Sequence, residues 1–327
     1  MKTFSLPMGL GAAAGMLILI LDSQTALEAS REGVQFVIQT VLPSLFPFFF
    51  LSGWLTGSDF RQFRILSGVA RLFRIPDSCS YLLLPAFLGG YPSGAQAIAS
   101  AHQQGQLSRE SAEQLLGYCS NAGPSFLFGI LSSSFPATWM CWALWGLHIV
   151  GALLAARLLP AVSEDCSAIS KEKKQHTMSD ILLCSIKTTA IVCGWVILFR
   201  VLIAFLERWC LWLVAPPFQV FLKGSIELTN GCFCLNQIQD VRLRFVICSA
   251  LLSLGGFCVT MQTKSVVQSL NLRYYRIGKG IQCVFSVCTA SAVLYRSVIP
   301  LLVPAIVVLL SQWKREKRSS FPGILRV

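Results

Sequence analysis

The chain has 327 residues, of which 54% are hydrophobic and only 13% are charged. Soluble domains carry about 25% charged residues, so this composition excludes an ordinary soluble globular protein. The net charge of +12 would suit nucleic acid, but the basic residues lie in short segments between long apolar runs. That distribution is typical of loops that face anionic lipid headgroups. We therefore predict a cell-membrane protein surrounded by the lipid bilayer, with no nucleic-acid partner.

The apolar runs predict helices as the membrane-spanning elements. In hydrocarbon every backbone N–H and C=O needs an internal partner, so only helices and closed barrels span bilayers. The runs are long and lack the alternating pattern of barrel strands. We predict an all-α, multi-pass protein with about seven to ten membrane segments, some of them broken or re-entrant. Its first half covers residues 1–160, a polar linker covers 161–180, and the second half covers 181–327 with a basic C-terminal tail.

The first apolar run, residues 5–21, is interpreted as a retained helix, with a secretory signal peptide as the alternative because small residues follow it. We expect a charged loop over residues 22–32. The next run, residues 33–57, contains Pro43 and Pro47. Each proline removes a backbone donor and clashes with the preceding turn, so this segment is predicted to be kinked or to form a re-entrant hairpin.

The rest of the first half alternates between basic and apolar segments. Residues 58–78 carry arginines at helical spacing among aliphatic and aromatic residues, which predicts an interfacial helix. Residues 79–101 are apolar but interrupted at 89–94, where glycines and a proline cluster. A second interruption is expected at 120–125, before an uninterrupted span at residues 137–159.

The second half contains four apolar runs, at residues 181–206, 209–222, 243–262 and 281–312. A polar patch at residues 227–231 separates the second run from the third. We expect a basic loop between the third run and the fourth, carrying Lys264, Arg273, Arg276 and Lys279.

A short motif occurs once in each half. A Gly-Gly-aromatic triplet at residues 89–91 precedes Gln96, and a second triplet at 255–257 precedes Gln262 by the same offset. This match predicts a two-fold internal repeat, with a chance match in a glycine-rich membrane chain as the alternative. Corresponding helix breaks in two halves are typical of transporters, whose binding sites are formed by unwound backbone near the middle of the membrane.

Five sequence stretches carry a resemblance to a known family; they are residues 42–49, 90–95, 119–129, 227–231 and 255–262. The five stretches occur in the same order as in the YlbJ-type sporulation integral membrane proteins, which the chain resembles. These belong to the wider group with the nucleoside-recognition or Gate domain, found also in concentrative nucleoside transporters and ferrous-iron transport proteins. The resemblance implies a multi-pass protein of a spore-forming bacterium that acts in spore cortex formation, and it implies no defined substrate.

The chain departs from that family pattern at two places. Gln96 stands where the resemblance leads us to expect a lysine, and residues 121–123 are a variant of a pattern richer in asparagine and serine. A substrate shared with the wider group therefore does not follow from the resemblance.

The residues at the breaks are the candidate solute-binding residues, because glycine and proline unwind the helix and expose carbonyl groups beside short polar side chains. They are Gly90, Pro92, Ser93, Gly94, Gln96, Ser120, Asn121, Ser125, Glu227, Thr229, Asn230 and Gln262. An intramembrane acid such as Glu227 is a functional candidate that would hold a cation or carry a coupling proton. The structural alternatives are helix packing through small residues and an ion pair between Glu227 and Lys223 at helical spacing.

Signatures of catalysis are missing from the sequence. It contains no P-loop, dinucleotide fingerprint, HExxH or Gly-x-Ser-x-Gly motif, and no Cys-x-x-Cys pair for a metal. We therefore predict no catalytic residues, no metal site and no cofactor. The leading hypothesis is binding or transport of a small polar solute, nucleoside-like or other, or of a coupling ion, needed for cortex formation. The alternatives are a non-transporting scaffold or assembly partner in the sporulation membrane, its protein partners unspecified, and an enzyme acting on a lipid-linked precursor.

Overall fold

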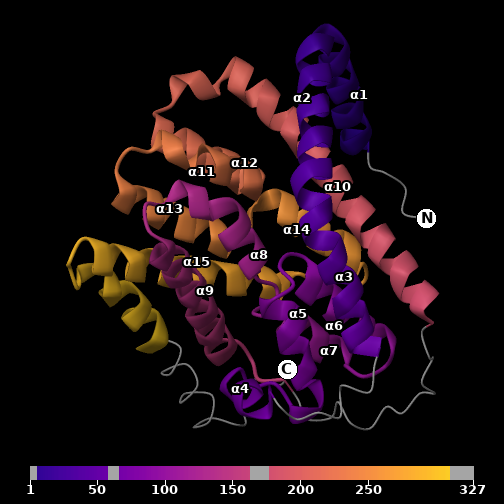
Figure 1. Cartoon of the computed structure of the whole chain (residues 1–327), viewed down its shortest axis with the longest axis vertical. Coiled ribbons are helices and arrows are strands. Elements are labelled where there is room, and N and C mark those ends of the chain that lie inside the picture. The colour runs from indigo at the N-terminus through magenta and orange to yellow at the C-terminus, as the bar shows by residue number, and fades with distance from the viewer. Residues whose placement is uncertain (1–5, 58–65, 163–176, 310–327) are drawn as a thin grey trace.

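The computed structural model describes residues 6–57, 66–162 and 177–309, and these residues form helices joined by short connections, without a strand (Figure 1). The chain begins with the apolar helix α1 (Leu6–Leu21), followed directly by α2 (Ser23–Phe36), which carries several charged residues. The loop predicted over residues 22–32 is wrong, because α2 begins directly after Asp22. Glu32 lies on α2 and pairs with Arg200 of α10 (Met178–Trp209), and Asp22, directly before α2, pairs with Arg208 of α10.

The segment with two prolines is a continuous helix. From α2 the chain passes through one π-helical turn, Val37–Val41, into α3 (Leu42–Gly57). The re-entrant hairpin offered as one reading of residues 33–57 is therefore not formed. A π turn inserts one extra residue into the helical hydrogen-bond ladder. This turn lies directly before Pro43 and Pro47, which have no backbone N–H to donate. The changed hydrogen-bond spacing accommodates the missing donors, so the helix continues through both prolines.

The remainder of the first half is built from short helices. They are α4 (Ser67–Leu72), a 3-10 helix (Asp77–Leu82), α5 (Leu83–Phe87), α6 (Ser93–Gln103), α7 (Arg109–Leu115), α8 (Pro124–Phe126), a π turn (Leu127–Leu131), a 3-10 turn (Ser132–Ser134) and the long α9 (Thr138–Leu158). The interfacial helix predicted over residues 58–78 falls partly outside the described residues. Its described part contains only the six residues of α4, followed by buried Phe73 and Ile75.

The second half begins with the 32-residue α10, which lies beside α2 and α3 (Figure 1). After it come a 3-10 turn (Leu211–Leu213), α11 (Pro216–Ile226), α12 (Leu228–Phe233), a 3-10 turn (Cys234–Gln237), α13 (Val241–Leu254), α14 (Gly256–Val267), α15 (Arg273–Leu294) and a 3-10 turn (Ile299–Leu301). The predicted basic loop is wrong. Lys264 belongs to α14 and Lys279 to α15, and only residues 268–272 connect the two helices.

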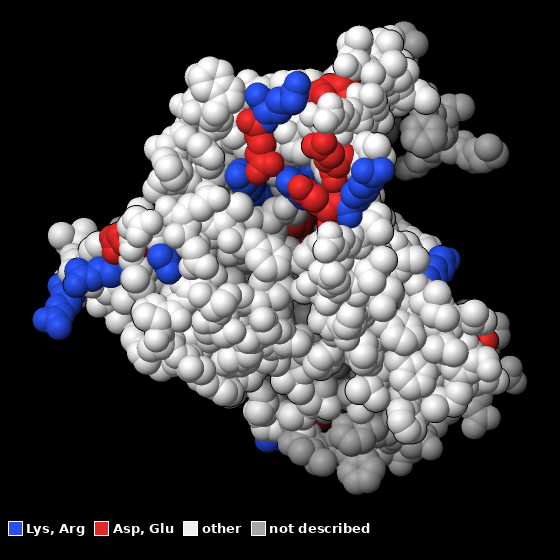
Figure 2. Space-filling model, turned by 45° about the horizontal axis from the view of Figure 1, so that its top comes forward, with Lys and Arg blue, Asp and Glu red and all other residues white. Residues whose placement is uncertain are grey.

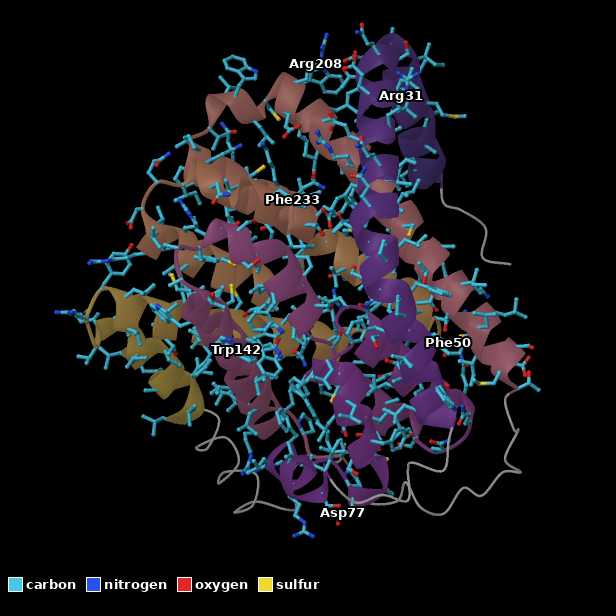
Figure 3. All side chains as sticks on the ribbon, viewed as in Figure 1. Arg31, Phe50, Asp77, Trp142, Arg208 and Phe233 are labelled. Carbon is cyan, nitrogen blue, oxygen red and sulfur yellow. The ribbon has the colours of Figure 1, made fainter. Side chains whose placement is uncertain are left out.

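Five helical segments of the described chain are long and apolar enough to cross a bilayer: Ser23–Leu55, Thr138–Leu158, Met178–Trp209, Val241–Val267 and Arg273–Leu294. Two shorter apolar helices, Gly9–Leu21 and Ile299–Leu309, accompany them, so the described spans lie at or below the lower end of the predicted seven to ten. Large apolar side chains such as Trp142 face outward, whereas Arg31 and Arg208 lie at one end of the molecule and Asp77 at the other (Figure 3). An all-α, multi-pass membrane protein is confirmed.

Charged side chains gather at the end of the molecule where α2, α10 and α11 meet, within a wide uncharged surface (Figure 2). Arg200 pairs with Glu32 at 2.6 Å and with Glu207 at 3.1 Å, and Lys223 pairs with Glu207 at 2.7 Å. These contacts join three helices, so the charges on the apolar helices are compensated where the chain segments meet.

Candidate functional site

Four interruptions of the helices lie together in the structure. They are residues 88–92 between α5 and α6, residues 116–123 between α7 and α8, Glu227 between α11 and α12, and Gly255 between α13 and α14. The first two are in contact, because a Cβ at Gly90 would lie 3.3 Å from the backbone nitrogen of Gly123. Gly90 has φ of 75°, which glycine adopts without the steric cost of a side chain. The glycine pattern therefore marks a backbone crossing as well as a helix end.

The third and fourth interruptions join the same contact region. A Cβ at Gly255 would lie 3.4 Å from Cζ of Tyr91, and one at Gly256 would lie 2.8 Å from the carbonyl oxygen of Gly224 in α11. Both glycines of this pair have left-handed backbone, with φ of 72° and 77°. The structure thus brings the four predicted segments together, although the unwound parts are shorter than predicted, since Ser93 already begins α6 and Gly256 begins α14.

Two carbonyl groups released by the interruptions accept hydrogen bonds from distant side chains. The carbonyl of Leu252, near the end of α13, accepts from the hydroxyl of Tyr91 at 3.0 Å. The carbonyl of Ser120 accepts from Nζ of Lys279. Pro124, four residues after Ser120, has no N–H to offer that carbonyl. Each freed backbone acceptor thus has a partner from another part of the chain, as buried backbone groups require.

Lys279 is the functional candidate that the sequence reasoning missed. Its side chain is buried, at 3% exposure, and Nζ donates to the hydroxyl of Tyr91 at 2.7 Å and to Oε1 of Gln282 at 3.0 Å, in addition to the Ser120 carbonyl. A signal for it exists in the sequence. Lys279, Gln282 and Ser286 recur at helical spacing and share one face of α15, which is the pattern of an inward polar stripe.

A chain of amides continues from Lys279 to the second interruption. Nε2 of Gln282 donates to Oδ1 of Asn121 at 3.1 Å, and Nδ2 of Asn121 donates to the carbonyl of Tyr118 at 2.7 Å. Beside it, the backbone N–H of Ala122 donates to Nε2 of His148 at 3.1 Å. The predicted site residue Asn121 therefore has protein partners for both ends of its amide and positions the α7–α8 connection.

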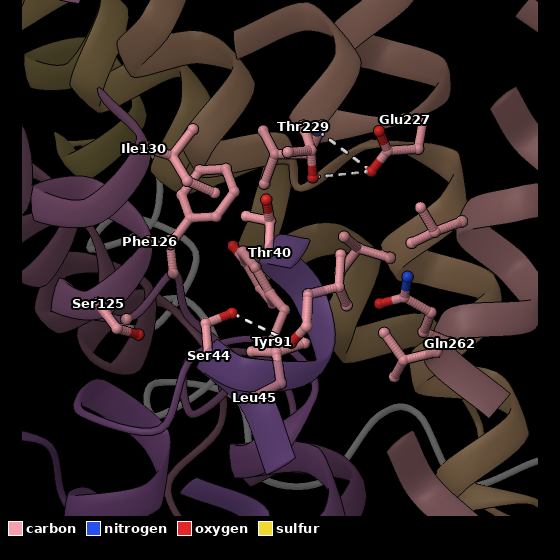
Figure 4. A pocket seen from close by; sticks show the side chains of 18 of the residues that line it. Thr40, Ser44, Leu45, Tyr91, Ser125, Phe126, Ile130, Glu227, Thr229 and Gln262 are labelled. Carbon is pink, nitrogen blue, oxygen red and sulfur yellow. Dashed lines mark hydrogen bonds between the residues drawn. The ribbon is translucent and has the colours of Figure 1, made fainter. Parts of the chain in front are cut away.

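A pocket with a volume of about 60 Å³ opens beside these contacts (Figure 4). Five predicted site residues line it: Gly90, Ser125, Glu227, Thr229 and Gln262. The sequence reasoning missed the contribution of the helix formed by α2 and α3, which supplies Thr40 and Ser44. In Figure 4, Ser125 lies on one side of the pocket and Glu227 with Gln262 on the other, with Thr40 and Tyr91 between them.

Glu227 is held by the residues that follow it. The backbone N–H and the hydroxyl of Thr229 donate to Oε1, both at 3.1 Å, and the backbone N–H and side-chain amide of Asn230 donate to Oε2, at 2.8 and 2.7 Å. The carboxylate is 2% exposed and caps the N-terminus of α12. The alternative pair with Lys223 is not formed, because Lys223 contacts Glu207 instead.

Two predicted residues line a second pocket, of about 70 Å³, between α3, α6 and α10. The hydroxyls of Ser93 and Ser52 lie 3.0 Å apart there, and Nε2 of Gln96 donates to Sγ of Cys184 at 3.5 Å. These side chains join the three helices. Ser93 and Gln96 therefore belong to a different cavity from Glu227 and Gln262, a separation that the common motif does not reveal.

The chain is similar over most of its length to a curated protein. The sporulation integral membrane protein YlbJ of Bacillus subtilis (strain 168) is 26% identical over an alignment of length 302; the aligned region covers 78% of this chain and 74% of the relative. Over most of its length the chain is therefore similar to this sporulation integral membrane protein. No protein-family model matches it, and no solved structure does.

The remaining predicted residues Pro92, Gly94 and Ser120 line neither of these two pockets. A side chain at Gly94 would collide with the carbonyl oxygen of Cys119, so glycine allows α6 to pass close to the α7–α8 connection. Pro92 lies directly before the first turn of α6, and the hydroxyl of Ser120 is buried without a hydrogen-bond partner. Solute binding by the predicted set stays a prediction, and the pocket residues are the part of it that faces a cavity.

Proposed function

We propose that this YlbJ-type protein binds a small polar solute or ion where the four helix interruptions meet, and passes it across the membrane in support of spore cortex formation. The observation that carries the proposal is the pocket at that meeting point, lined by residues from both halves of the chain. Transporters place their sites where broken helices from two halves face each other, because irregular backbone is tolerated in a membrane only around a cavity.

The lining favours an uncharged polar solute or a small ion. Thr40, Ser44 and Ser125 offer hydroxyl groups, and Gln262 offers an amide. The Glu227 carboxylate also lines the wall, but Thr229 and Asn230 already donate four hydrogen bonds to it. Pockets for drug-sized ligands are roughly 300 Å³ or larger. A cavity of about 60 Å³ suits a few atoms, so a ligand as large as a nucleoside requires the helices around the pocket to separate.

The scaffold hypothesis is supported by a different observation. The polar groups at the interruptions are largely satisfied by one another, with four donors on Glu227 and three acceptors around Lys279. Satisfied buried networks stabilise a single arrangement of helices. A protein that only shapes the sporulation membrane would need such a network and would not need the pocket.

Gln262→Leu is the variant that separates the two functions. It removes the amide from the pocket wall with little change of volume, and the amide's hydrogen bond is a local one, to Cys258 at 3.2 Å. Gln114→Leu is the matched control, because Gln114 is also buried, bonds the residue four positions earlier, and lies in α7 away from the pocket.

The measurement is thermal unfolding of the purified protein in detergent with nucleosides, small acids, metal ions and cell-wall precursors. A ligand that binds only the folded protein raises the melting temperature. We expect one chemical class to raise it in the wild type and in Gln114→Leu, and not in Gln262→Leu. The proposal fails if no class produces a shift, or if the shift survives in Gln262→Leu.

A cellular test addresses the role in sporulation. We expect deletion of the gene to lower the yield of heat-resistant spores, and Gln262→Leu to reproduce that loss at normal protein levels. Wild-type spores from the Gln262→Leu strain would favour the scaffold, because a scaffold uses the helices and not the pocket amide.

A further inference from the structure

The surroundings of Lys279 have the composition of a cation site. Nζ contacts three oxygen atoms of three chemical kinds: the phenol of Tyr91, the backbone carbonyl of Ser120 and the side-chain amide of Gln282. Hard monovalent and divalent cations are bound by such oxygen ligands, and membrane proteins often provide them as carbonyls of unwound helices. The ammonium group thus sits where unwound backbone would hold a dissolved ion.

Among the residues that the structure describes, no carboxylate forms an ion pair with this ammonium group. Each ion pair within the described ranges uses an arginine or Lys223, and Lys279 is in none of them. Burial of a charge without a counter-ion is costly unless its hydrogen-bonding capacity is fully used. Three acceptors for three ammonium hydrogens meet that requirement, and the ring of Tyr275, with its centroid 5.9 Å from Nζ, adds an electron-rich face.

The contacts of Lys279 also tie the interruptions to each other. Tyr91 lies in the first, Ser120 in the second, and the hydroxyl of Tyr91 reaches the carbonyl of Leu252 before the fourth. A positive charge at this point therefore stabilises the same unwound backbone that forms the pocket.

We propose that the Lys279 ammonium is a built-in replacement for a bound monovalent cation at the helix interruptions. The wild-type protein then needs no alkali-metal ion to hold these segments together. Removal of the side chain should leave an oxygen-lined cavity that accepts a dissolved cation. The inference goes beyond the proposed function and does not depend on which solute the pocket takes.

Two substitutions at one position test the idea. Lys279→Ala removes the charge and empties the space, so the oxygen atoms become available to an ion. Lys279→Met removes the charge and keeps most of the volume, so the cavity stays filled. Thermal unfolding of wild type and both variants is measured in potassium, ammonium, sodium and choline chloride at equal ionic strength.

We expect the small cations to raise the melting temperature of Lys279→Ala over its value in choline by about 2–4 °C, as a ligand of modest affinity does. Potassium and ammonium should act most strongly, because their size is close to that of the lysine ammonium. Wild type and Lys279→Met should show no difference among the salts.

Equal melting temperatures for Lys279→Ala in all four salts would overturn the proposal, and so would an equal cation response of the wild type. If Lys279→Ala does not fold in choline, recovery of folded protein in potassium supports the proposal, and failure in both salts contradicts it. The solute screen with Gln262→Leu is a separate measurement, so either proposal can fail without the other.

Discussion

Glu227→Gln tests whether the buried carboxylate at the start of α12 is a structural cap. The wild-type carboxylate accepts four hydrogen bonds, two on each oxygen, at 2.7–3.1 Å. A glutamine keeps one acceptor oxygen, and its NH₂ group replaces the other. If the oxygen stays with the two donors of Asn230, the NH₂ group faces the backbone N–H of Thr229, a donor that then lacks a partner.

The expected loss follows from these contacts. A lost N-cap costs about 1 kcal/mol, and a buried donor without an acceptor costs about 1–3 kcal/mol. Relief from burying a charge offsets part of this, so we expect destabilisation of about 2–3 kcal/mol. At about 2–4 °C per kcal/mol for larger domains, the melting temperature should fall by roughly 4–12 °C.

The assay is thermal unfolding followed with a thiol-reactive fluorescent dye, because buried cysteines such as Cys232 and Cys258 become reactive only on unfolding. Asp240→Asn is the matched control, since Asp240 caps α13 through one bond to the N–H of Arg242 and is exposed. It should lower the melting temperature much less than Glu227→Gln. Equal, small effects of both substitutions would refute the reasoning, and Glu227 would then be free to act in ligand binding alone.

Two further predictions concern the packing around glycines and the accessibility of cysteines. Gly94→Ala should strongly destabilise the protein, because the new methyl group would meet the carbonyl oxygen of Cys119, whereas Gly194→Ala, with open space around it, should be neutral or slightly stabilising in the same unfolding assay. In the folded protein, Cys210 is exposed directly after the end of α10 and should be alkylated rapidly by a maleimide, while buried Cys258 should react only after denaturation, as mass spectrometry of the labelled peptides would show. Fast labelling of Cys258 before unfolding would contradict the packing around α14.

Local chemistry was sufficient to predict the membrane class and the positions of the helix interruptions. Long apolar runs and clusters of glycine and proline act within a few residues, so residues 137–159 and 181–206 correspond closely to α9 and α10, and the interruptions fall at the expected places. The same local signals gave a wrong prediction at residues 22–32. There, charged side chains suggested a loop, but the charge of Glu32 on α2 is compensated by Arg200 on α10, 168 residues away in the sequence.

The identity of the pocket walls and the burial of Lys279 came only from tertiary contacts. Hydropathy assigns a lysine to a loop because it counts the cost of burial without knowing the partners. Here the partners of Lys279 include Tyr91 and Ser120, which precede it by 188 and 159 residues. Glu227 shows the opposite case: Lys223, its partner in the structural alternative, pairs with Glu207, and the residues of the next turn donate to the Glu227 carboxylate. Whether a buried charge is tolerated depends on acceptors and donors that folding brings together, and no local pattern contains that information.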